Sequence, residues 1–473
     1  MAFTEFCCKS GGSNLNAGTR TGSSTEPGNT ADFTYASGSW VSATGVFTVA
    51  SGNPSTDGVA VGDFASVYAD GATVTGFVGR VTAVTSSTIT VSLTAKSGTA
   101  PSDGSGNRTL RIGGAWQGPN GTSLFPIAFV ENTCVNASAD PVRVNFRGTF
   151  NITSTGAAVS GSQYSAITLS GYGTTYGDRT RAEFSWGSTA VDSALIFGTA
   201  GNPLIDSIIF SSAATSGNGV GLQCNSRGHI RNCVFTGWRL RGIQIVSAMI
   251  VDECEIYACG FTVAINIAGI YVDSTTGALI RNTIVHDCNG HAIHSYTGLH
   301  TLLNCIMYSN AGNGIRVGYA FVSNTLNIVG CDFYNNGLSG IDIAASPAAI
   351  HVLNSNFVKN GACGIKIATA AAYGVVTNCG FGAGAEANAL GDIDAQSSLV
   401  VSGSVNYTSH PWRDPANGDF RINDPAAKGT GRGLFVQTTG GSGTVGYPDI
   451  GAAQLQGGGS GGFSMSRLVN TGG

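Results

Sequence analysis

The chain has 473 residues, of which 70 are glycine and only 11% are charged, and its formal net charge is −4. The sequence has no basic run, which gives a nucleic-acid partner little support, and no stretch of about 20 apolar residues that predicts membrane insertion. The abundance of Gly, Ser, Thr, Asn and Val is typical of short strands joined by tight turns, so we expect an all-β protein.

The N-terminal part contains two different segments. Residues 1–30 are rich in Gly, Ser, Thr and Asn and are predicted to form an extended arm. They lack the basic and apolar regions of a secretory signal peptide, so we expect synthesis and folding in a cytoplasm. Residues 31–113 alternate between apolar and polar positions, as in VGDFASVYADG. This alternation predicts a small antiparallel β domain, which is a candidate attachment domain.

From about residue 200 to residue 405 the sequence repeats one pattern with a period of about 22–26 residues. The segment LLNCIMYSNAGNGIRV, residues 302–317, is one copy of this pattern. Its alternation with period two predicts short strands with one face inward, and each coil must stack on its neighbours to bury that face. The first position of the pattern is occupied by Asn232, Asn282, Asn304, Asn354 and Asn378.

This repeat resembles the right-handed parallel β-helix family, the architecture of pectate lyases and phage tailspikes. The resemblance implies a right-handed parallel β-helix over residues 114–408. The segments NGDFRI, residues 417–422, and DIGA, residues 449–452, resemble the closing segment of bacterial and phage β-helix repeat proteins. They imply a C-terminal cap over residues 409–456, followed by a Gly-rich linker and terminal peptide over residues 457–473.

Two rows of the repeat have an unusual composition. One inward row is filled by small residues, mostly cysteines, which we expect to be free thiols. Another row contains Asn310, Asn336 and Asn360, which predict an asparagine ladder at a turn. Cys259 and Cys288 share a row in adjacent coils and are compatible with a disulfide or a thiol pair. The cysteines and histidines lack the spacing of a metal site, so no metal or cofactor is predicted.

The family resemblance raises the question of polysaccharide cleavage, which needs outward acid–base residues. The sequence offers only isolated catalytic candidates, namely Asp332, Asp342, His286 and His294. Glu255 and Asp332 lie three coils apart, on the order of 14 Å at the strand spacing, and cannot act as a pair. His286 and His294 are predicted to point outward from different strands of one coil. No catalytic constellation results, so the sequence leans away from an enzyme.

Two further polar groups lie in the same part of the repeat. Asp287 and His291 are expected in a turn between strands. The row Arg316, Asp342 and Lys366 alternates in charge across adjacent coils, and it predicts either a surface ion ladder, which we favour, or a polar binding groove.

An outward row of aromatic and aliphatic residues is the most suggestive surface. Contiguous exposed apolar surface usually marks an interface. We expect packing against another copy of the chain, in a homotrimer, or stacking of sugars on the aromatic rings. The residues predicted for this interface or glycan-binding surface are Tyr257, Ile284, His286, Ile306, Tyr308 and Tyr334.

These features favour a structural protein of a phage particle: a tail spike, a fibre or a capsid-surface protein. Its predicted partners are other virion proteins, contacted through the N-terminal arm and domain or the C-terminal peptide, and host-surface polysaccharide. One alternative is an extracellular carbohydrate-active enzyme, a polysaccharide lyase or glycoside hydrolase, that uses the solenoid as its platform. A bacterial surface adhesin is a third hypothesis. The fold alone cannot decide among them.

Overall fold

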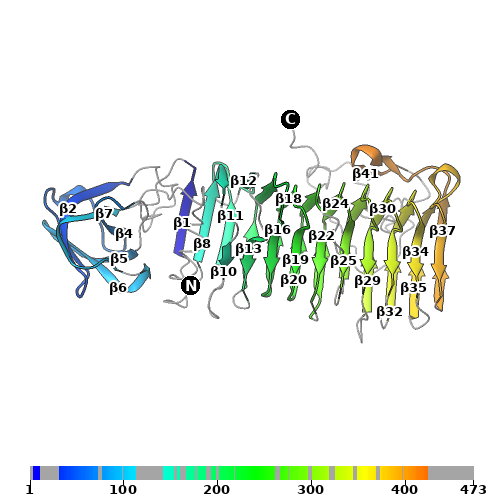
Figure 1. Cartoon of the computed structure of the whole chain (residues 1–473), viewed down its shortest axis with the longest axis horizontal. Coiled ribbons are helices and arrows are strands. Elements are labelled where there is room, and N and C mark those ends of the chain that lie inside the picture. The colour runs from blue at the N-terminus through cyan, green and yellow to red at the C-terminus, as the bar shows by residue number, and fades with distance from the viewer. Residues whose placement is uncertain are drawn as a thin grey trace, which may run out of the picture. The chain divides into compact units, whose positions relative to one another are not determined.

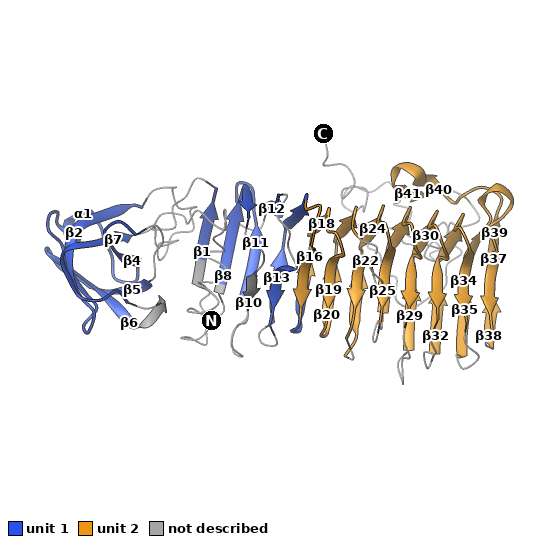
Figure 2. Cartoon of the chain, in the orientation of Figure 1, with its two compact units in different colours: residues 1–213, 225–228 blue, residues 214–224, 229–473 orange. Residues whose placement is uncertain are grey.

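The computed structural model describes part of the chain in detail. It describes residues 4–10, 31–72, 77–98, 100–112, 142–153, 157–159, 167–175, 178–187, 193–198, 202–217, 219–261, 267–274, 276–296, 301–318, 325–344, 349–368, 373–396 and 398–423. The predictions for residues 449–452 and for the linker and terminal peptide lie outside the described residues. The chain divides into two compact units, residues 1–213 with 225–228, and residues 214–224 with 229–473 (Figure 2).

The first unit contains a small closed antiparallel barrel, as predicted. Its six strands follow the order β2-β3-β6-β5-β4-β7 around the barrel. Trp40, Phe47 and Phe77 fill its core, and the indole N–H of Trp40 donates to the carbonyl of Pro101 at 3.0 Å. The strands are β2 (Phe33–Val41), β3 (Val46–Thr48), β4 (Phe64–Ala69), β5 (Phe77–Val84), β6 (Thr88–Gly98) and β7 (Gly104–Ile112), with α1 (Pro54–Asp57) between β3 and β4.

The first unit also contains parallel strands in three ladders. One ladder is β1 (Thr4–Lys9), β8 (Val142–Arg147), β11 (Ile167–Gly171) and β14 (Leu204–Asp206). The second is β9 (Thr149–Ile152), β12 (Ala182–Trp186) and β15 (Ile208–Ser212), and the third is β10 (Ala157–Val159) and β13 (Ser193–Phe197).

Within the predicted extended arm, residues 4–9 join the first of these parallel ladders. These residues form β1, which pairs in parallel with β8 from Thr4 to Lys9. Phe6, Cys7 and Cys8 are buried there, so apolar burial adds to the backbone pairing. An unpaired strand edge attracts other chains, and β1 occupies the edge that β8 would otherwise expose.

In the second unit, each coil contributes one strand to each of three parallel sheets (Figure 1). The first sheet contains β17 (Gly228–Arg231), β20 (Met249–Asp252), β23 (Ala278–Arg281), β26 (Thr301–Leu303), β29 (Thr325–Val329), β32 (Ala349–Leu353), β35 (Tyr373–Thr377) and β38 (Leu399–Ser402). The second contains β18 (Val234–Thr236), β21 (Glu255–Tyr257), β24 (Ile284–His286), β27 (Ile306–Tyr308), β30 (Asp332–Tyr334), β33 (Asn356–Val358), β36 (Gly380–Gly382) and β39 (Val405–Tyr407). The third contains β16 (Val220–Cys224), β19 (Arg241–Ile245), β22 (Ala268–Val272), β25 (His291–Ser295), β28 (Ile315–Val317), β31 (Ile341–Ile343), β34 (Cys363–Ile367) and β37 (Gly391–Ala395). Together the parallel strands form a β-solenoid of about nine turns, which confirms the predicted fold class.

The repeated residues have identifiable structural roles. The Asn at the start of the pattern has a positive φ, for example 52° at Asn304 and 48° at Asn354, and Asn tolerates this left-handed conformation better than most residues. The inward Phe row stacks, with the rings of Phe333 and Phe357 centred 4.7 Å apart. Gly314 and Gly340, directly before β28 and β31, allow neighbouring coils to approach closely, because a Cβ there would lie 2.6 Å and 2.7 Å from a carbonyl oxygen of the next coil.

The asparagine ladder is confirmed and is longer than predicted. Asn310 donates from Nδ2 to Oδ1 of Asn336 at 3.0 Å, and Asn336 donates in the same way to Asn360 at 3.0 Å. Asn360 continues the ladder to Asn388 at 2.9 Å. Each of these side chains is buried. The ladder therefore supplies partners for amide groups that would be costly to bury alone.

The eleven described cysteines are free thiols, and Cys259 and Cys288 are among them. Burial raises the pKa of Cys259, and its contact with Cys288 raises this pKa further. Of the two possibilities for this pair, the structure contains the thiol pair. No helix in the described ranges combines the length and apolar character needed to span a membrane.

The described part of the predicted C-terminal cap lies along the side of the solenoid. After β39 the chain reverses through β40 (Trp412–Asp414), η3 (Pro415–Asn417) and β41 (Asp419–Ile422), next to β24 and β30 (Figure 1). Strands β40 and β41 pair in antiparallel fashion. We call residues 410–422 the strap, since they cross several coils instead of covering the end of the last one.

The NGDFRI motif builds the turn of the strap. Asn417 donates from Nδ2 to Asp414 at 2.8 Å, and Gly418 has a φ of 78°, which favours glycine. Arg421 pairs with Asp419 through its Nε atom at 2.7 Å. Phe420, between these two exposed or half-exposed residues, is buried against the second sheet. The motif therefore combines a tight turn with an apolar anchor.

Candidate functional site

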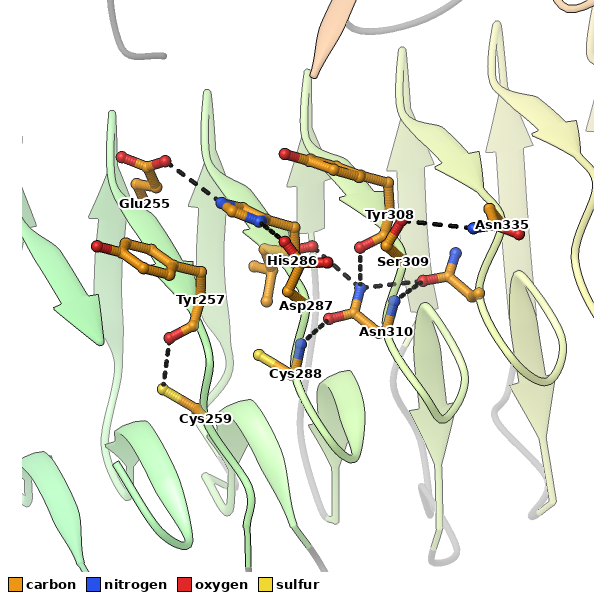
Figure 3. A network of polar contacts seen from close by, with 12 residues as sticks. Glu255, Tyr257, Cys259, His286, Asp287, Cys288, Tyr308, Ser309, Asn310 and Asn335 are labelled. Carbon is orange, nitrogen blue, oxygen red and sulfur yellow. Dashed lines mark hydrogen bonds and ion pairs between the residues drawn. The ribbon is translucent and has the colours of Figure 1, made fainter. Parts of the chain in front are cut away.

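The outer face of the second sheet carries the candidate site. Tyr257, His286, Tyr308 and Tyr334 occupy one register position in β21, β24, β27 and β30. Parallel pairing in register places their rings one above the other, as Figure 3 shows for the first three. The rings of Tyr257 and His286 are 5.2 Å apart at an interplanar angle of 11°, and those of His286 and Tyr308 are 4.7 Å apart at 7°.

His286 bridges two carboxylates at the centre of this stack (Figure 3). Its Nδ1 atom lies 2.7 Å from Oδ2 of Asp287, and its Nε2 atom lies 3.3 Å from Oε1 of Glu255. Burial alone lowers the pKa of His286, but the bonds to Glu255 and Asp287 outweigh burial and raise this pKa. The imidazole can therefore hold a proton, with both ring nitrogens engaged by the protein. Sequence spacing indicates only that Glu255 is far from Asp332, whereas the structure brings its carboxylate to His286 of the next coil.

The bridge predicts a pH-dependent contribution of His286 to stability. In the unfolded chain the pKa of His286 is about 6.5, and in the folded protein it is higher. The protonated ring therefore stabilises the fold fully at pH values below about 6.5. This contribution is lost as the pH rises through the pKa of the folded protein. The urea midpoint of the wild type should therefore fall more between pH 6 and pH 9 than that of His286→Gln. Parallel pH profiles of the two proteins would show that the bridge does not stabilise the fold.

The strap covers the aromatic and aliphatic face that the sequence predicts to be exposed. Ile284 and Ile306 are each 2% exposed, and Tyr308 and Tyr334 are also buried. These side chains form one apolar cluster with Trp412, Phe420 and Ile422 of the strap. The prediction of an exposed face was wrong because an outward apolar row looks the same in sequence whether the same chain or another copy covers it. Only Tyr257 and His286 retain partial exposure in the row.

Asp332 is also covered and is fully buried. Its Oδ1 atom accepts from Nδ2 of Asn356 at 2.8 Å, and the Asn356 oxygen accepts from the hydroxyl of Tyr407 at 3.0 Å. Alternation along β30 points Asp332 outward, but this position is buried beside Asn356 and Tyr407. A catalytic role in contact with a substrate from solution is therefore not available to Asp332 in this structure.

His294 and Asp342 lie on the third sheet, away from His286. His294 faces Arg316 in the next coil, and Arg316 faces Asp342. His294 shares the outward register position with Arg316, as predicted, but its side chain is only 3% exposed. Burial, with the nearby charges of His291, Arg316 and Arg241, lowers the pKa of His294 to about 3. Neutral imidazole is therefore its form near neutral pH.

His291 lies near His294 as well. It is the first residue of β25 and not a turn residue as predicted.

The predicted row of alternating charges is in register. Arg316, Asp342 and Lys366 are partners in consecutive coils, and Asp394 follows them. Among the described residues, no ion pair within 4.0 Å joins these side chains, so the row is not a ladder of direct ion pairs. Within the described ranges, no three His, Cys, Asp or Glu side chains are grouped so that they could hold a metal ion.

One family model agrees with the parallel strands of the second unit. Residues 266–381 match the family model described as right handed beta helix region. The A-module of a mannuronan C-5 epimerase from Azotobacter vinelandii is similar at 11% identity and a TM-score of 0.43, over 60% of this chain and 96% of that chain. The ORF18 protein of Geobacillus virus E2 is similar at 13% identity and a TM-score of 0.37, over 59% of this chain and 56% of that chain.

Pectate lyase Pel9A is similar at 14% identity and a TM-score of 0.36, over 67% of this chain and 88% of that chain. At these identities and TM-scores, nothing about this chain is concluded from the three solved structures. No curated protein matches the sequence significantly. The part of the chain from 266 to 381 is thus a right-handed β-helix region, and its function has to be argued from its own residues.

Proposed function

We propose that the chain is a structural protein of a phage particle, with the solenoid as a rigid shaft that contacts host-surface glycan. The observation that carries this proposal is that the outward acid–base side chains of the second sheet bond to other side chains of the same chain. Both nitrogens of His286 are bonded to carboxylates, Asp332 is buried against Asn356, and the strap seals the apolar face beside them. These groups stabilise a scaffold.

The two-part organisation supports the same role. The barrel of residues 33–112 has its own core, which suits an attachment module ahead of a shaft. Self-association, proposed as a trimer, needs a surface other than the sealed face. The last coil offers one, because Leu390 is 76% exposed and Val400 is 64% exposed. Large apolar side chains exposed in this way favour contact with another chain.

Particle association tests this proposal. Particles from the organism that encodes the chain are banded on a density gradient and examined with antibodies raised against the full-length protein. We expect the chain in the particle band, with antibody label on intact particles. Recovery of the chain only in the soluble fractions, with no label on intact or opened particles, would contradict the virion role.

The second candidate function is a carbohydrate-active enzyme, and His286 is the observation that favours it. Its ring lies between Glu255 and Asp287 beside the partly exposed Tyr257, and its raised pKa suits a general acid. In this case a polysaccharide panel should yield reducing ends or unsaturated products, and His286→Gln should abolish them. Absence of products from the wild-type protein would reject this candidate.

A further inference from the structure

A group of cationic and imidazole side chains lies on the outer side of the third sheet, apart from the strap. We call it the basic cluster: Arg241, His291, His294 and Arg316, from β19, β25 and β28. His294 pairs in register with Arg316, and the rings of His291 and His294 are 5.4 Å apart. The guanidinium of Arg241 lies 3.6 Å from the centre of the Tyr271 ring, in the register position next to His294.

The hydrogen bonds of His291 define its tautomer. Its Nδ1 atom accepts from the backbone N–H of Asn313 at 3.0 Å, and the Asn313 side-chain nitrogen lies 3.3 Å from the same atom. The neutral ring must then carry its proton on Nε2. Burial and the charge of Arg316 lower the pKa of His291 to about 4, which is consistent with a neutral ring.

Two donors therefore face each other in the basic cluster. The Nε2 atom of His291 lies 3.5 Å from Nη1 of Arg316, and each carries a proton. Such a pair lacks an acceptor. Nearby, the buried Nε atom of Arg316 and the buried Nδ1 atom of His294 have no hydrogen-bond partner among the described residues. His294 is more than nine-tenths buried, and buried polar atoms of this kind normally have partners.

The charges around these donors select an acceptor with one negative charge. The groups that shift the pKa of His294 are His291, Arg316 and Arg241, so the local field is positive. Asp342 lies at one side, where its Oδ2 atom is 3.4 Å from the Asn313 side-chain nitrogen. Asp273 is close enough to Arg241 to interact with its charge. Two flanking carboxylates disfavour a doubly charged anion, whereas a carboxylate offers two acceptor oxygens at lower charge.

We propose that the basic cluster binds the carboxylate of an acidic sugar, with its oxygens accepting from Nε2 of His291 and the guanidinium of Arg316. This inference deepens the proposed contact with host-surface glycan and rests on it. The chemical class is a uronate unit of a polysaccharide. Inorganic phosphate shares the oxyanion chemistry, and the experiment separates the two.

The test is calorimetric titration of the full-length protein with tetragalacturonate at low ionic strength. Cellotetraose is the neutral control, and inorganic phosphate is the control for a simple anion. We expect saturable binding of tetragalacturonate only. Arg316→Gln should weaken it at least about tenfold, because a charge-assisted hydrogen bond is lost. Lys366→Gln, in the same row two coils further, is the matched control and should change affinity less than about twofold.

Arg316→Lys keeps the charge but not the planar donor group, so we expect its affinity between those of the wild type and Arg316→Gln. Circular dichroism verifies that each variant is folded. Any one of three results would overturn the site. Lys366→Gln could lose as much binding as Arg316→Gln, or phosphate could bind as tightly as uronate. The third is that the wild type shows no saturable uronate binding. If uronate binding fails while the chain still bands with particles, the basic cluster is rejected and the virion role stands.

Discussion

In Trp412→Ala, the backbone amides of the strap should exchange with solvent about a hundredfold faster, or more, than in the wild type. Trp412 is 1% exposed and packs on Tyr334, with ring centres 5.7 Å apart, and on Phe420 at 5.1 Å. Truncation of a buried tryptophan costs about 3–5 kcal/mol, and local opening reports such a loss directly. Hydrogen–deuterium exchange of peptides covering residues 410–423 measures the effect.

Tyr373→Ala is the matched control, because Tyr373 is an aromatic residue that is 74% exposed. Its exchange profile should equal that of the wild type. Unchanged exchange of the strap in Trp412→Ala would mean that the strap is not anchored by this side chain. The sealed outer face of the second sheet would then need another explanation.

The largest global effect is expected from Asn336→Asp, at the middle of the asparagine ladder. Asn336 donates from Nδ2 to Oδ1 of Asn360 and to the carbonyl of Met307, both at 3.0 Å. A carboxylate places a negative oxygen against these two acceptors in a buried site. An unpaired buried charge costs about 3–5 kcal/mol, so the unfolding free energy at pH 7 should fall by roughly this amount.

The pH dependence of this variant gives a sharper test. Burial raises the pKa of the introduced carboxyl, so its ionisation favours the unfolded state as pH rises above about 3.9. Relative to the wild type, the variant should thus regain most of its stability between pH 7 and pH 4. Asn335→Asp is the control, since Asn335 is adjacent but exposed, and its denaturation curve should match that of the wild type. Equal effects of the two substitutions would contradict the ladder's role.

The repeat allowed much of this fold to be predicted, because residues at fixed spacing must fall into register in a stacked solenoid. The ladder from Asn310 to Asn360 and the charge row from Arg316 to Lys366 follow from spacing alone. Strand β1 could not be found in this way. It lies far from its partner β8 in sequence and has no copy of the repeat.

The candidate site was predicted only in part, for a related reason. The repeat ends at about residue 405, and no period indicates that the chain then reverses over the second sheet. The alternation of Trp412, Phe420 and Ile422 with polar residues is a signal of burial, but it does not identify the buried surface. Asn289 and Gly290 favour a turn, so nothing in this part of the sequence indicates that a strand begins at His291.

The most direct test of the proposed scaffold role is one sample of full-length protein examined in two ways. Light scattering measures its native mass, and assays for reducing ends and unsaturated products measure its action on a panel of bacterial polysaccharides. We expect a stable homo-oligomer, proposed as a trimer, that releases no sugar products. A monomer that cleaves a polysaccharide would contradict the scaffold role and would make His286, Glu255 and Asp287 the first residues to substitute.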